Sequence, residues 1–419
     1  MVNKSENKME IGVGCVHASF WLIIFILFST DSMLVSTNSS RLFAKISWIL
    51  IIAFFSFNAN CLRLTLKEIL YLFSFSCFML LSGLINDGGF EVNYVQRALL
   101  LWVAVLVVKS IPYEDYIKSY IHAINFIAAF SMICWVLHGV ILDIPFIPSI
   151  YTGEFSYKSL FFTNISPRSI RNYGPFWEPG AFQLFINFAI FLQIREKKYF
   201  NKKSLFLLVV TLLTTLSSSG IAILLLIFLY FLVAKKNSSG ANIFVLKFLS
   251  IIFLIGFVFF LLNSNYGNDV FGKIYAYIDN PLEKNSANVS AYTRFNSVGA
   301  NISMIMQKPL FGWGISQSKE VLLNNFYLTS NPNTILGCGS SYGIFVMALY
   351  CFLIIRGAIS NSNNVILNFI YLIIWGIMLS VESLLVSLPF FIFLFYESRM
   401  FVSQNSHWIE KSDVLPIGR

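Results

Sequence analysis

The chain has 419 residues, of which 57% are hydrophobic and only 12% are charged, and its mean hydropathy is +0.72. Soluble globular domains carry about 25% charged residues, so this composition, with repeated apolar runs of about 20 residues, predicts a polytopic all-α membrane protein. The net charge of +9 does not indicate nucleic acid as a partner, because most Lys and Arg residues flank apolar segments and report membrane topology.

We expect about twelve transmembrane helices in one integral membrane domain that covers residues 1–419. A tight outer turn at Ser217, Ser218, Ser219 and Gly220 divides the seventh span from the eighth. No cleavable signal is expected, because the first span lacks a small-residue cleavage site. The spans fall near residues 13–33, 44–60, 68–86, 95–111, 119–142, 177–195, 204–218, 219–234, 244–263, 335–356, 364–381 and 383–398.

Basic residues crowd the connections on one side of these spans, above all in the stretch 195–203, and predict that both termini are cytoplasmic. Arg41 and Lys45 fall on the outer side against this rule. Two large loops, 143–176 and 264–334, then lie on the periplasmic face, where function is expected to concentrate.

The second of these loops contains Phe295, Val298, Ile302 and Ile305 at helical spacing. This pattern predicts an amphipathic helix that lies along the membrane surface.

Several familiar motifs are missing from the sequence. It contains no Walker A motif, no GxGxxG, no HExxH, no C-x-x-C, and no Asp-x-Asp on the outer side. ATP-driven transport and metal-dependent sugar transfer are therefore disfavoured, and no metal site or cofactor is expected.

The strongest candidate for chemistry is Glu178, which stands where a polar loop enters the sixth span. A charge at the membrane boundary is costly unless it faces water, a partner or a substrate. Arg168 and Arg171 lie upstream, and Arg294 lies in the second large loop. Arginines bind phosphate oxygens in bidentate fashion and could hold a diphosphate leaving group, while Glu178 could accept a proton from an attacking hydroxyl.

Each of these residues also has a structural interpretation. The arginines could contact lipid headgroups or pair with Glu178. Ser219 could offer a hydroxyl to a sugar or simply belong to a serine-rich turn. Glu382, in the short last outer connection, is interpreted as a solvated charge.

Four ordered blocks between about residues 165 and 360 resemble the O-antigen polymerase and ligase superfamily, membrane enzymes that act on polyprenyl-linked glycans. The first block is similar to the Gly-x-Phe-x-Glu-Pro-Gly motif of the polymerase branch. The blocks are Gly174-Pro175-Phe176-Trp177-Glu178-Pro179-Gly180-Ala181-Phe182, then Ser217-Ser218-Ser219-Gly220, then Arg294 with Pro309-Leu310-Phe311-Gly312-Trp313-Gly314, and last Asn331-Pro332-Asn333-Thr334 ahead of Gly343-Ile344.

Two departures from the ligase branch favour the polymerase branch. The ligase branch has an arginine where this chain has Ser219, and a histidine where it has Pro332. The resemblance implies a membrane-embedded glycosyltransferase-like fold in a bacterial inner membrane, with its active face in the periplasm. It implies a metal-independent polymerase of undecaprenyl-diphosphate-linked oligosaccharide repeat units, such as those of O-antigen.

In this interpretation Glu178 is catalytic, Arg168, Arg171 and Arg294 bind the diphosphate, and Asn333 and Ser219 bind substrate. The expected partners are lipid-linked glycans, membrane lipid and a chain-length regulator protein. The alternatives are an O-antigen ligase that acts on lipid A core and, from another class, a polysaccharide transporter or flippase.

Overall fold

The computed structural model describes residues 14–33, 64–88, 92–152, 155–167, 169–234, 289–362, 364–385 and 387–401, with four positions between 272 and 279. The predicted spans near 44–60 and 244–263 lie outside the described residues, as does Arg168. The long helices, in chain order, are α1 (Gly14–Asp31), α4 (Leu66–Asn86), α5 (Val92–Ser110), α6 (Tyr113–Val136), α8 (Pro179–Arg195), α9 (Lys202–Thr214), α10 (Ser218–Ala234), α13 (Val289–Gln307), α14 (Ile315–Phe326), α16 (Ile344–Asn361), α17 (Val365–Val381) and α18 (Leu388–Glu397). Shorter elements are α7 (His138–Asp143), α15 (Thr334–Tyr342) and the 3-10 helix η2 (Lys197–Tyr199).

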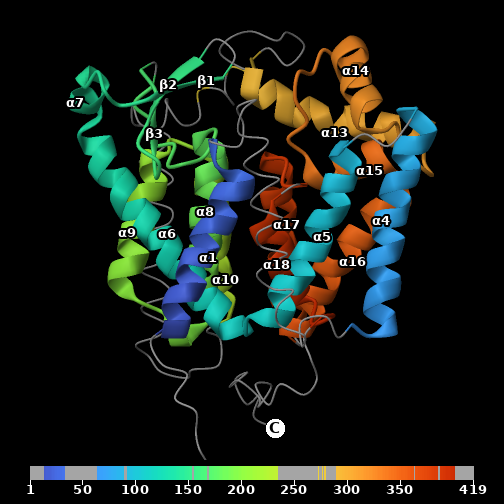
Figure 1. Ribbon diagram of the computed structural model, residues 1–419, viewed down its shortest axis with the longest axis horizontal. Coiled ribbons are helices and arrows are strands. Elements are labelled where there is room, and N and C mark those ends of the chain that lie inside the picture. Colours follow the sequence, from blue (N-terminus) through green and yellow to red (C-terminus); the bar gives the residue numbers. More distant parts are fainter. Residues whose placement is uncertain are drawn as a thin grey trace, which may run out of the picture.

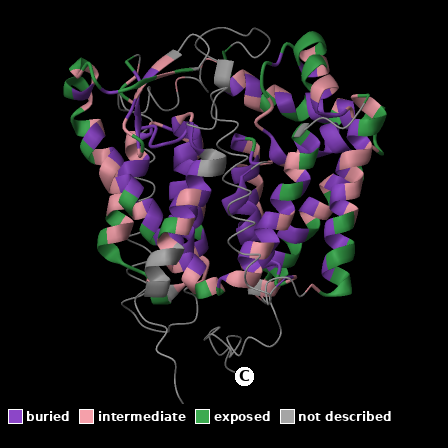
Figure 2. Cartoon of the chain, in the orientation of Figure 1, coloured by how far each residue is buried: buried purple, intermediate pink, exposed green. Residues whose placement is uncertain are grey.

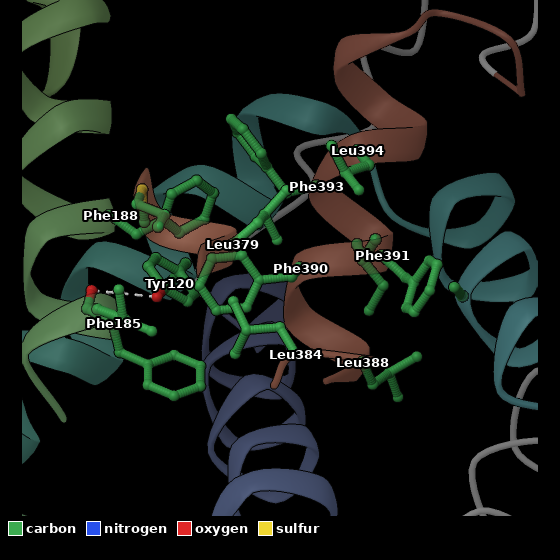
Figure 3. Close-up of a cluster of buried hydrophobic side chains, with 14 of the residues drawn as sticks. Tyr120, Phe185, Phe188, Leu379, Leu384, Leu388, Phe390, Phe391, Phe393 and Leu394 are labelled. Carbon is green, nitrogen blue, oxygen red and sulfur yellow. Dashed lines mark hydrogen bonds between the residues drawn. The ribbon is translucent and has the colours of Figure 1, made fainter. Parts of the chain in front are cut away.

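Two central helices, α8 and α18, organise the bundle. All of α18 is buried, and so is α8 from Pro179 to Gln193, because both sequences are predominantly apolar. Helix α8 contacts α6, α9 and α10, and α18 contacts α1, α5 and α16. Figure 3 shows the aromatic packing between them. The rings of Phe188 and Phe393 pack edge to face, with their centroids 4.2 Å apart. Figure 2 shows the buried residues of the bundle as its purple interior.

Buried polar contacts fix α8 against its neighbours. The side-chain amide of Asn187 donates to the Gly220 carbonyl of α10 at 3.0 Å. At the C-terminal end of α8, Arg195 forms a buried ion pair with Glu397 of α18 at 2.5 Å. Helices that lie among other apolar helices are held in register by such contacts. These contacts with α10 and α18 fix the position of α8, and therefore also that of its first turn.

The outer surface of the bundle is apolar. On α4, Leu70 and Phe73 are more than half exposed, and Phe369 on α17 is equally exposed. Two described helices, α4 and α6, are long and apolar enough to cross a membrane, and α10, α16, α17 and α18 are shorter apolar helices. An apolar exterior over an apolar interior fits a helical membrane protein. The number of spans and their topology stay predictions.

The segments from the two predicted large loops gather at one end of the bundle, where Figure 1 shows the sheet, α7, α13 and α14. We call this the loop end. The opposite end holds the connections between α5 and α6 and between α8 and α9 (Figure 1). Helices α8 and α17 therefore run in opposite directions, and the start of α8 lies at the same end as the end of α17.

The first large loop contains a small antiparallel sheet that the sequence analysis did not predict. Its strands are β1 (Ser149–Thr152), β2 (Phe155–Ser159) and β3 (Asn164–Ile165), in the order β1-β2-β3. The register pairs Thr152 with Phe155 and Lys158 with Ile165. Strands of two to five residues are too short to show a period-two pattern, which explains the omission.

The structure divides the predicted span 335–356 at Gly343. This residue has φ +92°, and a Cβ there would lie 2.0 Å from the carbonyl oxygen of Leu310. The next residue, Ile344, donates its backbone N–H to the Pro309 carbonyl at 2.8 Å. The third and fourth sequence blocks thus pack on each other, and the span becomes two helices, α15 and α16.

Candidate active site

Glu178 is the N-cap residue of the buried helix α8. Pro179 occupies the first helical position, where its fixed φ suits the start of a helix. The preceding turn requires Gly174, which has φ +53° and packs so closely on Phe182 that a Cβ would lie 2.9 Å from the ring. The Glu178 side chain makes no capping hydrogen bond to its own helix. Its carboxyl group is therefore available to other partners at the loop end.

One of these partners is Glu382, which follows the last residue of α17. The carboxyl group of Glu178 lies close enough to that of Glu382 to raise its pKa. Glu382 is only 5% exposed, so its interpretation as a solvated charge is wrong. Its burial depends on the meeting of α17 with the start of α8, which is far away in the sequence.

The backbone of Glu382 is also held. The Thr334 hydroxyl donates to the Glu382 carbonyl oxygen at 2.8 Å and accepts from the Leu384 N–H at 2.9 Å. Thr334 is completely buried at the start of α15. These two hydrogen bonds fix the turn after α17, and therefore the position of Glu382 relative to α8.

Arg294, on α13, forms an ion pair with Glu382. Its Nη2 lies 3.4 Å from Oε1 of Glu382, and the Arg294 side chain is 26% exposed while that of Glu382 is 7% exposed. A separation of 3.4 Å is at the long end for a charge-assisted bond. The guanidinium therefore bridges the buried acidic pair and the outside.

Arg171 is part of the same electrostatic cluster but has a second task. Its guanidinium interacts with Glu178, Arg294 and Glu382. At the same time Nε and Nη2 donate to the carbonyl oxygens of Thr215 and Leu216, at 2.9 and 3.1 Å. These carbonyls end α9, where helices leave acceptors unsatisfied. Arg171 thus holds the segment before α8 against the turn between α9 and α10.

The cluster changes the acidity of two of its members. Burial raises the pKa of the Glu382 carboxyl well above its usual value of 4.5, the adjacent Glu178 raises it further, and Arg294 lowers it. Burial also lowers the pKa of the Arg171 guanidinium, while Tyr173 and Glu178 act in the opposite direction. We refer to Glu178, Glu382, Arg294 and Arg171 as the acid–arginine cluster.

Ser219 and Asn333, two further predicted site residues, are among the described residues. Ser219 lies in the first turn of α10, with its hydroxyl 3.0 Å from that of Ser217. Asn333 caps α15 through a bond from the Leu336 N–H at 2.9 Å. Ser219 is close in sequence to the carbonyls that Arg171 binds. Asn333 is next to Thr334, whose hydroxyl binds the Glu382 backbone. Their roles in substrate binding stay predictions, as does that of Arg168, outside the described residues.

Arg171 also lines a small hollow of about 10 Å³, about the room that a single water molecule needs, together with Trp135, His138 and Asn172. Within the described part of the chain, no group of three or more His, Cys, Asp or Glu residues could hold a metal ion.

The sequence around Glu382 contains one signal of a functional residue. Glu382 is an ionisable residue between two apolar segments that read almost as one, and charges in such places are usually functional. Its partner could not be named from the sequence, because Glu178 is about 200 residues away.

One family model matches the chain. It is the model of the O-antigen ligase family, and it matches residues 204–351. The matched range contains Ser219, Arg294 and Asn333, whereas Glu178 and Glu382 lie outside it. The comparison with curated proteins gives no match. The resemblance inferred from the four sequence blocks is confirmed at the level of the superfamily.

Proposed function

Because the chain carries a domain of the O-antigen polymerase and ligase superfamily, we propose that it is a polymerase of lipid-linked oligosaccharide repeat units. It would transfer the nascent glycan from undecaprenyl diphosphate to a hydroxyl of the next lipid-linked unit. The observation that carries this proposal is the acid–arginine cluster, in which an acidic pair and two arginines from separate segments meet at the loop end.

The chemistry that this cluster supports is a displacement at the anomeric carbon of the donor glycan. The acceptor hydroxyl oxygen forms a bond to that carbon, and the bond from that carbon to the diphosphate oxygen breaks. The hydroxyl proton passes to Glu178, and the diphosphate leaves with its negative charge on the undecaprenyl carrier. A positioned carboxylate contributes about 10²–10⁴-fold to such a reaction.

Arg294 would stabilise the leaving diphosphate. Its guanidinium is partly exposed and its bond to Glu382 is long, so donor groups remain for phosphate oxygens. Arg171 uses two donors on backbone carbonyls. We therefore assign it a positive charge near the diphosphate and a positioning role, with less direct contact than the sequence alone implied.

The matched family model is described as O-antigen ligase and does not distinguish a polymerase from a ligase, so the choice between them rests on other residues. Glu178 lies in the Glu-Pro-Gly block that is similar to the polymerase branch. The ligase branch carries an arginine and a histidine at the positions of Ser219 and Pro332. These three positions favour a polymerase.

The placement of charge supports a periplasmic site in the inner membrane. Lys198, Lys202 and Lys203 lie in or beside the connection between α8 and α9, at the end opposite the loop end. Basic connections face the cytoplasm, so the loop end would face the periplasm, where lipid-linked repeat units and a chain-length regulator would meet it.

The test is a gel of the surface glycan from a strain that lacks this protein, complemented with wild type, Glu178→Gln or Glu320→Gln. Glu320 is exposed on α14 at the same end and serves as the matched control. We expect the deletion and Glu178→Gln to leave only single repeats on the lipid, and Glu320→Gln to restore the full ladder. Equal amounts of each variant in the membrane must be verified by immunoblot.

Other outcomes of this gel contradict the proposal in distinct ways. Loss of all glycan from the lipid A core would identify a ligase. Accumulation of repeat units on the cytoplasmic side would identify a flippase. A normal ladder from Glu178→Gln would remove that residue from catalysis.

A further inference from the structure

Arg97, in the first half of α5, has no carboxylate within ion-pair distance among the described residues. Its guanidinium instead donates to the Tyr342 hydroxyl at the end of α15 and lies over the Tyr342 ring, 5.7 Å from the centroid. Tyr342 is completely buried, and Arg97 is half-buried. A neutral hydroxyl uses only one of the N–H donors of a guanidinium, so most of the Arg97 fork is available to another acceptor.

Asp87, at the end of α4, does not balance this charge by direct contact, because its carboxylate has other partners. It accepts from the Tyr94 hydroxyl and from the backbone N–H groups of Ile315 and Gln317, at 3.0 and 3.3 Å for the two N–H groups. Asp87 thus caps the start of α14, where unpaired N–H groups favour a negative charge.

The end of α15 does not supply the missing acceptor either. Helix ends attract cations through their unpaired carbonyl groups, but here these groups are occupied. The Ser340 carbonyl accepts from the Trp313 N–H at 2.8 Å, and the Ser341 carbonyl accepts from the Gly314 N–H at 2.9 Å. An arginine among apolar helices is costly unless it meets an anion or water. Phosphate groups of lipids are anions that fit the arginine fork.

Helix α15 connects Arg97 with the acid–arginine cluster. Its first residue, Thr334, bonds the backbone of Glu382, and its last residue, Tyr342, bonds Arg97. The helix has nine residues, so a rise of about 1.5 Å per residue separates its two ends by about 12 Å. Helix α15 also contacts α13, which carries Arg294. Arg97 is therefore a second cationic position, held at a defined distance from the cluster.

We propose that Arg97 binds the diphosphate of the acceptor, the second lipid-linked unit, while Arg294 holds the diphosphate of the donor. This inference rests on the proposed function. The attacking hydroxyl and the acceptor diphosphate lie at opposite ends of one repeat unit. The acceptor diphosphate must therefore be held away from Glu178 by the length of an oligosaccharide, and the axis of α15 provides about 12 Å. No bond forms or breaks at Arg97, which only binds and orients the acceptor.

Native mass spectrometry of the purified protein with undecaprenyl diphosphate counts the diphosphates bound to each chain. We expect two on wild type, one on Arg97→Gln and one on Arg294→Gln. The control is Lys319→Gln, on the exposed face of α14, which should keep two. Arg97→Lys retains the charge and should also keep two, with weaker binding of the second. Equal numbers on wild type and Arg97→Gln would overturn the proposal, and so would a complete loss of the second diphosphate from Arg97→Lys.

The headgroup of a phospholipid offers the same phosphate chemistry and is distinguished by competition. An excess of phosphatidylglycerol is added to the same samples. We expect wild type to keep its second undecaprenyl diphosphate. If phosphatidylglycerol replaces that diphosphate on wild type and fails to bind Arg97→Gln, the position serves a phospholipid and the acceptor assignment is wrong.

The role in the reaction is tested by comparing two acceptors, a lipid-linked repeat unit and the same oligosaccharide without its lipid diphosphate. We expect Arg97→Gln to slow transfer to the lipid-linked acceptor by at least about tenfold, the effect of losing hydrogen bonds from a charged group. Transfer to the free oligosaccharide should keep the wild-type rate, whereas Arg294→Gln should lose both reactions. Equal slowing of both reactions in Arg97→Gln would show a structural role and contradict acceptor binding.

This inference and the proposed function fail in different ways. If the second diphosphate depends on Arg97 but the deletion strain makes a normal ladder, the polymerase assignment fails, and the acceptor role fails with it. If the deletion abolishes the ladder but Arg97→Gln matches wild type in binding and transfer, the polymerase assignment stands and the second site is wrong.

Discussion

Gly180 and Glu382 lie so close together that residue 180 has no room for a side chain. A Cβ built on Gly180 would lie 2.5 Å from Oε1 of Glu382 and 3.4 Å from Nη2 of Arg294. Gly180 lies in the first turn of α8, where backbone N–H groups lack intrahelical partners and favour negative charge. The glycine of the Glu-Pro-Gly block thus allows the acidic pair to sit against the start of the helix.

Gly180→Ala should therefore displace the Glu382 carboxyl without removing any polar group. We expect polymer formation to fall by about 10²-fold, because small displacements of catalytic groups have effects of that size. The matched control is Gly299→Ala on α13, where a Cβ meets nothing within 4 Å. Equal losses from both variants would show that Gly180 has no special role, and the measurement is the rate of chain extension in isolated membranes.

Arg294→Lys tests whether the shape of the guanidinium matters as well as its charge. A lysine keeps the positive charge near Glu382 but binds phosphate oxygens as a point charge, not as a fork. We expect the ladder to shorten strongly in Arg294→Lys and to vanish in Arg294→Ala, with unchanged protein levels. Full-length ladders from Arg294→Lys would show that Arg294 contributes only its positive charge and not the fork shape of its guanidinium. Lys319→Gln, on the exposed face of α14, controls for a change of charge at this end.

Arg171→Lys should lower stability more than Arg294→Lys. The Arg171 guanidinium donates to two backbone carbonyls that a lysine cannot reach together, and hydrogen bonds from charged groups contribute about 1.5–3 kcal/mol. We expect a loss of about 1–3 kcal/mol, seen as a lower midpoint of thermal unfolding in detergent. An unchanged midpoint combined with lost activity would assign Arg171 to substrate contact alone.

The stability of the wild type relative to Glu382→Gln should depend on pH. The folded state raises the pKa of Glu382 above 4.5, so the folded protein retains a proton that the unfolded chain releases above that pH. Stability from this group is therefore complete below about pH 4.5 and is lost as pH rises through the folded pKa, by up to about 1.4 kcal/mol per pH unit. Gln does not titrate, so Glu382→Gln should gain in unfolding midpoint over wild type as pH rises. A constant difference across pH would contradict a raised pKa.

Local sequence features predicted the start of α8 and the turn before α10 correctly. The predicted span 177–195 corresponds to α8, and the serine-rich turn separates α9 from α10. Both depend on nearby residues, namely proline, glycine and serine at the boundaries of apolar runs. The amphipathic pattern of the second large loop likewise corresponds to α13, where Phe295 and Ile302 are about half exposed and Ile305 is buried.

The features that the sequence did not predict are those formed by distant segments. The burial of Glu382 requires α17 and α8 to meet at the loop end, and the break at Gly343 requires the Leu310 carbonyl beside it. The carbonyl partners of Arg171 lie more than 40 residues away. Composition and periodicity carry no information about such pairings, since they describe one segment at a time.

Thr334 provides the sharpest test of how the acidic pair is positioned, because its hydroxyl forms hydrogen bonds to the backbone of the turn after α17. Its hydroxyl donates to the Glu382 carbonyl and accepts from the Leu384 N–H. Thr334→Val keeps the shape but leaves both buried backbone groups unpaired, at a cost of about 1–3 kcal/mol for each group. We expect Thr334→Val to lose both unfolding stability and polymer length, and Thr334→Ser, which keeps the hydroxyl, to retain both. If Thr334→Val is stable and fully active, the turn does not need this hydroxyl. The position of Glu382 relative to α8 is then set by its contact with Gly180 instead.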